Sequence, residues 1–229
     1  MSLKGKRIAV TGAFGSLGTA VAEAALAAGA KVAAIDRADA PASGVDLGAA
    51  RCFGGVDLAD TAQAKAAIDE AAKALGGLDA LVNVAGTFRF ETLADGSPDT
   101  WDLLYRINVR TAVAASKAAL AHLGDGGRVV NIGAASALKA GAGVGAYTAS
   151  KAGVLRLTES LAEELKPRGI TVNAVLPSII DTPPNRRDMP KADFGKWVRP
   201  EQLADVIVFL LSDQASAVTG ALIPVTGRV

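Results

Sequence analysis

The feature that most constrains this fold is a regular alternation of short, almost uninterrupted apolar segments with helix-length segments. The apolar segments read RIAVTG, KVAAID, LDALVNVAG, GRVVNIG, ITVNAVLP and ALIPVTG. The helix-length segments are 17–28, 61–75, 101–122, 147–166 and 200–212. Strands that lack polar alternation are typical of a sheet covered on both faces. The alternation therefore predicts an α/β fold: one doubly wound parallel sheet with helices on both sides.

The length and charge of the chain limit what kind of protein it is. The chain has 229 residues, half of them hydrophobic, which suits one domain with a sizeable core and no linker. Lys plus Arg number 24 against 23 Asp plus Glu, which argues against a nucleic-acid partner. No apolar run is long enough for a membrane span, and the start MSLKGKRIAVTG lacks a secretory h-region. We expect a cytoplasmic protein with a small-molecule substrate and no membrane partner.

Cysteine and histidine are too scarce to form a disulfide or a metal site. Cys52 is the only cysteine, which excludes an internal disulfide. His122 is the only histidine, so soft ligands for zinc are lacking. We interpret both as packing or surface residues and predict no metal.

A glycine-rich turn follows the first apolar segment and opens the first helix. In TGAFGSLG, Gly12 permits a tight turn, while Gly15 and Gly18 let the backbone approach a pyrophosphate resting on the helix N-terminus. Ser16 and Leu17 complete this candidate phosphate site. The spacing predicts a dinucleotide.

An acidic residue closes the second apolar segment, where a dinucleotide would place its adenosine ribose. Asp36 follows Gly18 by 18 residues, and a carboxylate there accepts hydrogen bonds from ribose hydroxyls and repels a 2′-phosphate. Arg37 stands next to it and can instead hold that phosphate. We predict that the chain binds NAD(H) in preference to NADP(H), and NADP(H) stays open as the alternative.

The chemistry is predicted to lie on the helix 147–166. Tyr147 and Lys151 are four residues apart and share one face of that helix. A free tyrosine has a pKa near 10, and a neighbouring ammonium favours the phenolate and lowers that pKa. The pair therefore predicts a general acid/base that works near neutral pH.

Together these motifs resemble the short-chain dehydrogenase/reductase family over essentially the whole chain. The resemblance is carried by TGAFGSLG, the strand end at Asp36, the pair Asp57-Leu58, NVAG at 83–86, Asn108 in RINV, Tyr147-x-x-x-Lys151 and LPSIIDT. It implies a single Rossmann-type domain of about seven strands that transfers hydride between NAD(P)(H) and a small organic substrate. The long helices 101–122 and 147–166 resemble the association helices of the family, which implies a homodimer or homotetramer.

The resemblance also implies roles for individual residues. Asn108 would support a proton relay through water, and Lys151 would hold the nicotinamide ribose as well as tune Tyr147. The implied cofactor contacts are Asp57 and Leu58 at the adenine, the backbone of Asn83, Val84, Ala85 and Gly86, and Pro177, Ile180 and Thr182 at the nicotinamide and phosphate end.

Two positions depart from the family pattern. Ser16 replaces one glycine of the turn, with Gly15 beside it, and Ala134 stands where most of the family has a serine that donates to the substrate oxygen. A lost donor of this kind costs roughly 3–4 kcal/mol of transition-state stabilisation. Three interpretations follow. Ser136 supplies the hydroxyl from the same face of a continuing strand, the substrate is not a simple carbonyl, or the chain is a nucleotide-binding sensor with weak catalysis.

The tract 178–199 is predicted to be a loop that acts as a substrate lid. It contains Pro183, Pro184 and Pro190, and loops this long in a compact domain are often functional. Its cations, which can contact an anionic substrate or solvent, are Arg186, Arg187, Lys191, Lys196 and Arg199. The candidate aromatic and apolar wall of the pocket is Phe88, Phe90, Met189, Phe194 and Trp197.

The lid and Ala134 are similar to those of quinonoid dihydropteridine reductase, a member of the same family. A quinonoid dihydropterin takes hydride into a delocalised ring, so no single oxygen develops full negative charge and a serine donor matters less. We therefore predict a dihydropterin-like acceptor first, with a ketone/alcohol or 3-oxoacyl thioester substrate as the alternative.

Overall fold

All seven strands of the computed structural model, which describes residues 1–229, run parallel in one sheet ordered β3-β2-β1-β4-β5-β6-β7. The strands are β1 (Arg7–Thr11), β2 (Lys31–Ile35), β3 (Arg51–Phe53), β4 (Leu78–Asn83), β5 (Leu123–Ile132), β6 (Thr171–Pro177) and β7 (Leu222–Val225). The order reverses direction between β1 and β4, which is where a doubly wound sheet opens a crevice at its carboxyl edge. This confirms the predicted fold class.

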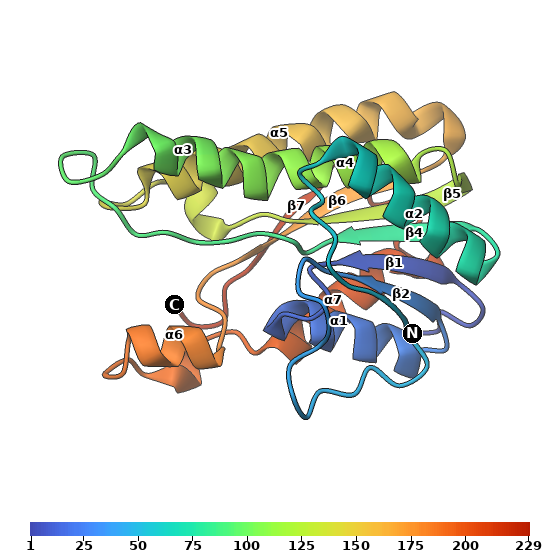
Figure 1. The fold of residues 1–229 in the computed structure, drawn as a ribbon, viewed down its shortest axis with the longest axis horizontal. Coiled ribbons are helices and arrows are strands. Elements are labelled where there is room, and N and C mark those ends of the chain that lie inside the picture. Colours follow the sequence, from blue (N-terminus) through green and yellow to red (C-terminus); the bar gives the residue numbers. More distant parts are fainter.

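Helices cover both faces of the sheet (Figure 1). One face carries α1 (Ser16–Ala27) and α7 (Pro200–Leu211). The other carries α2 (Thr61–Leu75), α3 (Pro98–Tyr105), α4 (Thr111–Ala119) and α5 (Gly145–Leu165). The short α6 (Pro183–Asp188) lies away from the sheet, beside the C-terminus. No helix of the structure combines the length and the apolarity that crossing a membrane requires.

Alternate residues of each strand pack into two separate cores. Ile8 and Val10 point into the core under α1 and α7. Ala9 and Leu81 point into the core under α2, α4 and α5. Because both faces are covered, most strand positions are apolar, and all seven residues of β6 are buried, the polar Thr171 and Asn173 included.

The segment predicted as one long helix over 101–122 differs in detail. It begins at Pro98, passes through a π-helical turn at Arg106–Arg110 and ends at Ala119. The apolar pattern of the segment does not distinguish a π turn from an α turn. The π turn carries Asn108, whose side chain bonds to Thr87. Most alanines of this segment face the core of their own chain, and none of the following is exposed: Ala112, Ala114, Ala115, Ala118 and Ala119.

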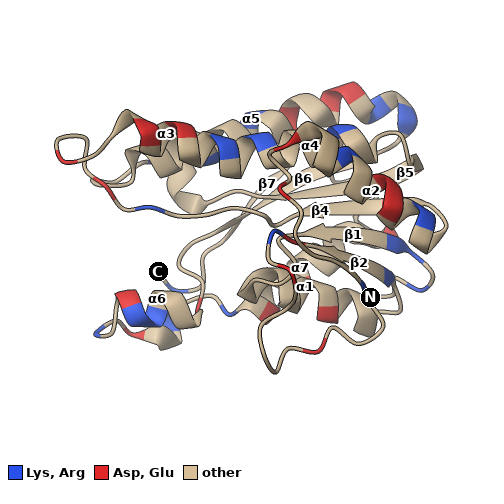
Figure 2. Cartoon of the chain, viewed as in Figure 1, with Lys and Arg blue, Asp and Glu red and all other residues tan.

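The tract 178–199 is more ordered than the predicted loop. Thr182 caps α6, and Pro183 and Pro184 occupy the first helical positions, where a missing backbone N–H costs nothing. A 3₁₀ turn follows at Phe194–Lys196. The prolines therefore start a helix here, so the tract is not one continuous loop as the sequence predicts. Charges of both signs lie on α6, as they do on α2 and α5 (Figure 2).

Candidate active site

The glycine-rich turn packs against the strand end beside it at two points. Gly12 has φ of 63°, and a Cβ placed on it would lie 2.7 Å from the backbone of Ala85. A Cβ on Gly18 would lie only 2.0 Å from the carbonyl oxygen of Gly12. Gly15 differs, because a Cβ there would meet nothing nearer than that oxygen at 3.6 Å. Gly12 and Gly18 are thus required by the fold, whereas Gly15 leaves an open cradle in front of the helix.

That cradle opens into a groove of ≈ 800 Å³ at the carboxyl edge of the sheet. The first turn of α1 contributes Ser16, Leu17 and Gly18, whose backbone N–H groups have no partner within the helix. Such groups and the positive end of the helix dipole favour an anion. The predicted residues that line the groove are Gly12, Gly15, Ser16, Leu17, Gly18, Asp36, Arg37, Asp57, Leu58, Val84, Ala85, Gly86 and Thr182. The residues present therefore fit a dinucleotide.

Asp36 is fixed in the groove by backbone donors. Its Oδ2 accepts from the N–H of Phe14 at 2.9 Å, and its Oδ1 accepts from the N–H of Ala38 at 3.0 Å. Each carboxylate oxygen keeps a lone pair for a further donor. Arg37 beside it is exposed, so one anionic and one cationic side chain line the same end of the groove.

Buried polar side chains meet at the other end of the groove, behind Gly86. A Cβ on Gly86 would lie 2.9 Å from Asn108 Oδ1 and 3.2 Å from Lys151 Nζ. Both side chains are buried, at 1% and 5% exposure. Lys151 Nζ donates to the carbonyl oxygen of Ile132 at 2.8 Å, which directs the ammonium toward the end of β5. The amine therefore lies directly behind the groove wall.

The pKa of Tyr147 is shifted in the direction opposite to the sequence-based expectation. Burial raises the pKa of Tyr147 to about 12. Burial lowers the pKa of Lys151 to about 8. The expected lowering at Tyr147 is absent because desolvation disfavours the phenolate. At pH 7 Tyr147 is therefore a neutral acid, suited to giving a proton to a reduced oxygen.

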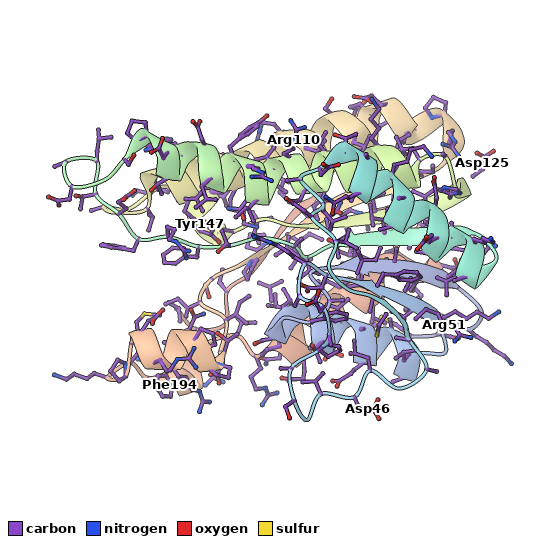
Figure 3. All side chains as sticks on the ribbon, in the orientation of Figure 1. Asp46, Arg51, Arg110, Asp125, Tyr147 and Phe194 are labelled. Carbon is purple, nitrogen blue, oxygen red and sulfur yellow. The ribbon has the colours of Figure 1, made fainter.

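The Phe88 ring packs against the Tyr147 ring. The two rings meet edge-on, with centroids 4.9 Å apart and planes at 78°. Phe90, two residues on, lies instead over Gly143, and Glu91 N–H donates to the Gly143 carbonyl at 2.7 Å. The segment after β4 is thereby tied to the loop that precedes α5. Figure 3 shows Tyr147 below α3 and α5, with Phe194 across from it beside α6.

The predicted lid residues hold the lid together. Phe194 and Trp197 contact each other with ring centroids 4.8 Å apart, and the Arg186 guanidinium lies 4.8 Å from the Phe194 centroid. Arg186 is also paired with Asp181. Lys196 pairs with Asp193 at 3.7 Å. Three lid cations have no carboxylate partner within 4 Å, namely Arg187, Lys191 and Arg199.

Ala134 is buried at 3% exposure and ends the extended backbone after β5. A 3₁₀ turn, Ala135–Ala137, begins at once, so the predicted alternation that would put Ser136 on the same face does not apply. Ser136 is partly exposed and bonds to no other side chain. Its hydroxyl is therefore carried by a turn and not by the strand.

Several predicted residues do not line the groove. Asn83 is buried and donates to Ser116 Oγ at 3.0 Å and to Asn131 Oδ1 at 2.8 Å. Pro177 is buried at the end of β6, and the half-buried Ile180 pairs with Val198 in an isolated bridge. None of the three belongs to the groove lining.

Sequence reasoning missed part of the groove. The additional lining residues are Phe14, Ala38, Ala40, Ala42, Val56, Thr87, Arg89, Ile107 and Thr111. Most of them flank predicted residues in the chain, which is a usable signal. Arg89 and Ile107 come from the segment after β4 and from the π turn, and no local motif marks them.

Comparison with known proteins identifies the class. A family model described as enoyl-(acyl carrier protein) reductase matches residues 12–227. The 2-(S)-hydroxypropyl-CoM dehydrogenase 3 of Xanthobacter autotrophicus is 37% identical, over 98% of this chain and 96% of that protein. A 3-oxoacyl-(acyl-carrier-protein) reductase of Salmonella typhimurium is 33% identical, over 99% of this chain and 98% of that protein. A solved short chain dehydrogenase from Burkholderia cenocepacia in complex with NADP is 34% identical, with a TM-score of 0.87 over 99% of this chain and 98% of that one.

These matches and the groove define an NAD(P)-dependent oxidoreductase. The chain belongs to the short-chain dehydrogenase/reductase family.

Proposed function

We propose that this chain interconverts a secondary alcohol and a ketone, with NAD(H) as the favoured dinucleotide. When bound, the dinucleotide supplies or accepts the hydride. In the direction of ketone reduction Tyr147 gives the proton to the substrate oxygen, because it is a partly buried neutral phenol against Phe88 and one helical turn from Lys151. Lys151 holds the ribose at the groove end, since its Nζ lies directly behind Gly86. The position of Tyr147 carries this proposal.

The substrate class is supported by the relatives. The Xanthobacter protein is named as a dehydrogenase of a hydroxypropyl compound and the Salmonella protein as a 3-oxoacyl reductase. Both names describe alcohol/ketone chemistry. The unpaired cations Arg187 and Lys191 on the lid favour a substrate that carries an anionic group at its far end.

The cofactor preference is proposed from Asp36. Its fixed carboxylate would accept from ribose hydroxyls and would repel a 2′-phosphate. The Burkholderia structure holds NADP, so a relative with this fold binds the phosphorylated dinucleotide. Binding titrations with NADH and NADPH test this preference, and Asp36→Ala is expected to narrow the difference between the two dissociation constants. Tighter NADPH binding by the unchanged protein would contradict it.

A quinonoid dihydropterin-like acceptor is the second candidate, and Ala134 is the observation that favours it. A buried methyl group in place of a donor is tolerable when no single oxygen develops charge. None of the relatives named above is described as a pteridine reductase, so the alcohol/ketone proposal comes first.

NADH oxidation with matched acceptors tests the proposal. Ketones and 3-oxoacyl thioesters go in one set of assays and quinonoid dihydropterin in another. Tyr147→Phe is expected to lower ketone turnover by about 10²–10⁴-fold, while NADH binding stays unchanged. Intact turnover in this variant would exclude Tyr147 as the acid/base.

Ala134→Ser separates the two substrate classes. A restored donor is expected to raise ketone turnover by about tenfold or more and to leave dihydropterin turnover unchanged. Ala135→Ser is the matched control, because it adds a hydroxyl to the neighbouring turn. Dihydropterin turnover well above that of every ketone would support the second candidate.

A further inference from the structure

The π-helical turn Arg106–Arg110 touches both ends of the groove. Arg106 and Arg110 reach the segment after β3, where Arg106 pairs with Asp57 at 2.7 Å and Arg110 Nε donates to the Ala59 carbonyl at 2.7 Å. Asn108 points the other way, toward Thr87 and the catalytic helix. One turn of helix thus binds two parts of the site that lie far apart in the sequence.

Asp57 is held at two oxygens. Its Oδ1 accepts from the N–H of Ala59 at 2.9 Å, and its Oδ2 accepts from an Arg106 NH2 group at 2.7 Å. The carboxylate belongs to the groove lining together with Leu58, whereas Arg106 does not. Arg106 therefore acts on the groove only through Asp57.

Residues four apart share one helix face. Arg106 and Arg110 therefore both face the segment 57–59, while Asn108 between them faces the segment after β4. Single π turns within α-helices are frequent at functional sites.

We propose that Arg106 is a positioning residue for the adenosine half of the dinucleotide, acting by holding the Asp57 carboxylate in place. This inference rests on the proposed use of the groove for a dinucleotide. Arg106 is exposed, at 58% of its side chain, so its replacement removes the contact with Asp57 without opening the core. An ordinary exposed ion pair adds little to stability. We therefore expect replacement of Arg106 to change ligand affinity and not the stability of the fold.

The test is a double-mutant cycle on ligand affinity, using 5′-AMP and NADH as probes. Arg106→Met is expected to lower the affinity for each probe by about tenfold, which corresponds to about 1.4 kcal/mol of binding free energy. In an Asp57→Ala background the same replacement is expected to have no further effect, because the two residues act as one unit. Arg156→Met, which removes the distant Arg156–Glu159 pair on α5, is the matched control and should change nothing.

Each other outcome overturns the inference in a distinguishable way. Unchanged 5′-AMP affinity in Arg106→Met, with normal binding by the parent protein, would refute the role of Arg106 and leave the proposed function standing. If Arg106→Met lowered the affinity in the Asp57→Ala background as much as it does in the parent protein, Arg106 would not act through Asp57. A parent protein that binds neither NADH nor NADPH would overturn both proposals.

Discussion

Asn108 and Thr87 hold each other through two reciprocal hydrogen bonds. The Thr87 N–H donates to Asn108 Oδ1 at 2.7 Å, and Asn108 Nδ2 donates to the Thr87 carbonyl at 3.0 Å. The same Nδ2 lies 2.9 Å from Ser150 Oγ, whose hydroxyl donates to the Tyr147 carbonyl at 2.7 Å. These hydrogen bonds give the Asn108 side chain a structural role, because they join the segment after β4 to α5, the helix that carries Tyr147.

Replacing Asn108 by alanine is expected to destabilise the protein. The change leaves the Thr87 backbone groups without partners and should lower the free energy of unfolding by about 2–3 kcal/mol. Denaturant unfolding measures this loss. Hydrogen exchange at the Thr87 amide is expected to accelerate by a larger factor than exchange in β1. An unchanged midpoint together with an unchanged Thr87 exchange rate would contradict the structural role.

Two glycines of the same turn are expected to behave differently when a methyl group is added. Gly18→Ala forces a Cβ against the Gly12 carbonyl and should cost about 3 kcal/mol of stability. Gly15→Ala has room in the folded chain, so the thermal midpoint should barely change. Its Cβ would nevertheless enter the cradle before α1, and NADH binding should weaken. If Gly15→Ala bound NADH as tightly as the parent, the cradle would not be the phosphate site.

Phe88 is expected to control the acidity of Tyr147. The chain has two tyrosines, so a Tyr105→Phe background leaves the phenol of Tyr147 as the only one to titrate. Phe88→Ala removes the edge-on ring and admits water, which should lower the raised pKa by roughly one unit. Ultraviolet absorbance of the phenolate against pH gives the value. Phe90→Ala, which removes the ring over Gly143, is the control and should leave the pKa in place.

Lys151 is expected to make stability depend on pH. Burial lowers its pKa from 10.5 to about 8, so the folded chain releases this proton before the unfolded chain does. The contribution of Lys151 to stability is therefore full above pH 10.5 and is lost as the pH falls toward 8. Relative to Lys151→Met, the unfolding free energy of the parent should rise by up to about 3 kcal/mol across that interval.

The measurement is a pair of denaturant curves at a series of pH values without dinucleotide. Because all other groups are shared, the difference between parent and variant isolates Lys151. A difference that stays constant from pH 8 to pH 10.5 would show that the ammonium is not desolvated in the folded chain.

The local sequence pattern was enough to predict the strands that are buried on both faces and the short motifs. The helix Thr61–Leu75 begins and ends where the sequence predicts, because Asp60 caps it and Gly76 ends it in a left-handed conformation. The short strand β3 is not among the apolar runs of the sequence. The other six strands and the glycine turn follow from those runs and from Gly12 and Gly18. These features depend on residues that are neighbours in the chain, so periodicity and turn chemistry suffice to predict them.

The tertiary structure decided the properties that depend on residues distant in the sequence, namely pKa shifts and long-range hydrogen bonds. The pKa of Tyr147 depends on burial, which disfavours the phenolate. In the π turn Asn108 bonds to Thr87, and Arg106 pairs with Asp57, 49 positions away in the sequence. Desolvation and long-range hydrogen bonds have no signature in a local window, because they depend on which distant segments the fold brings together.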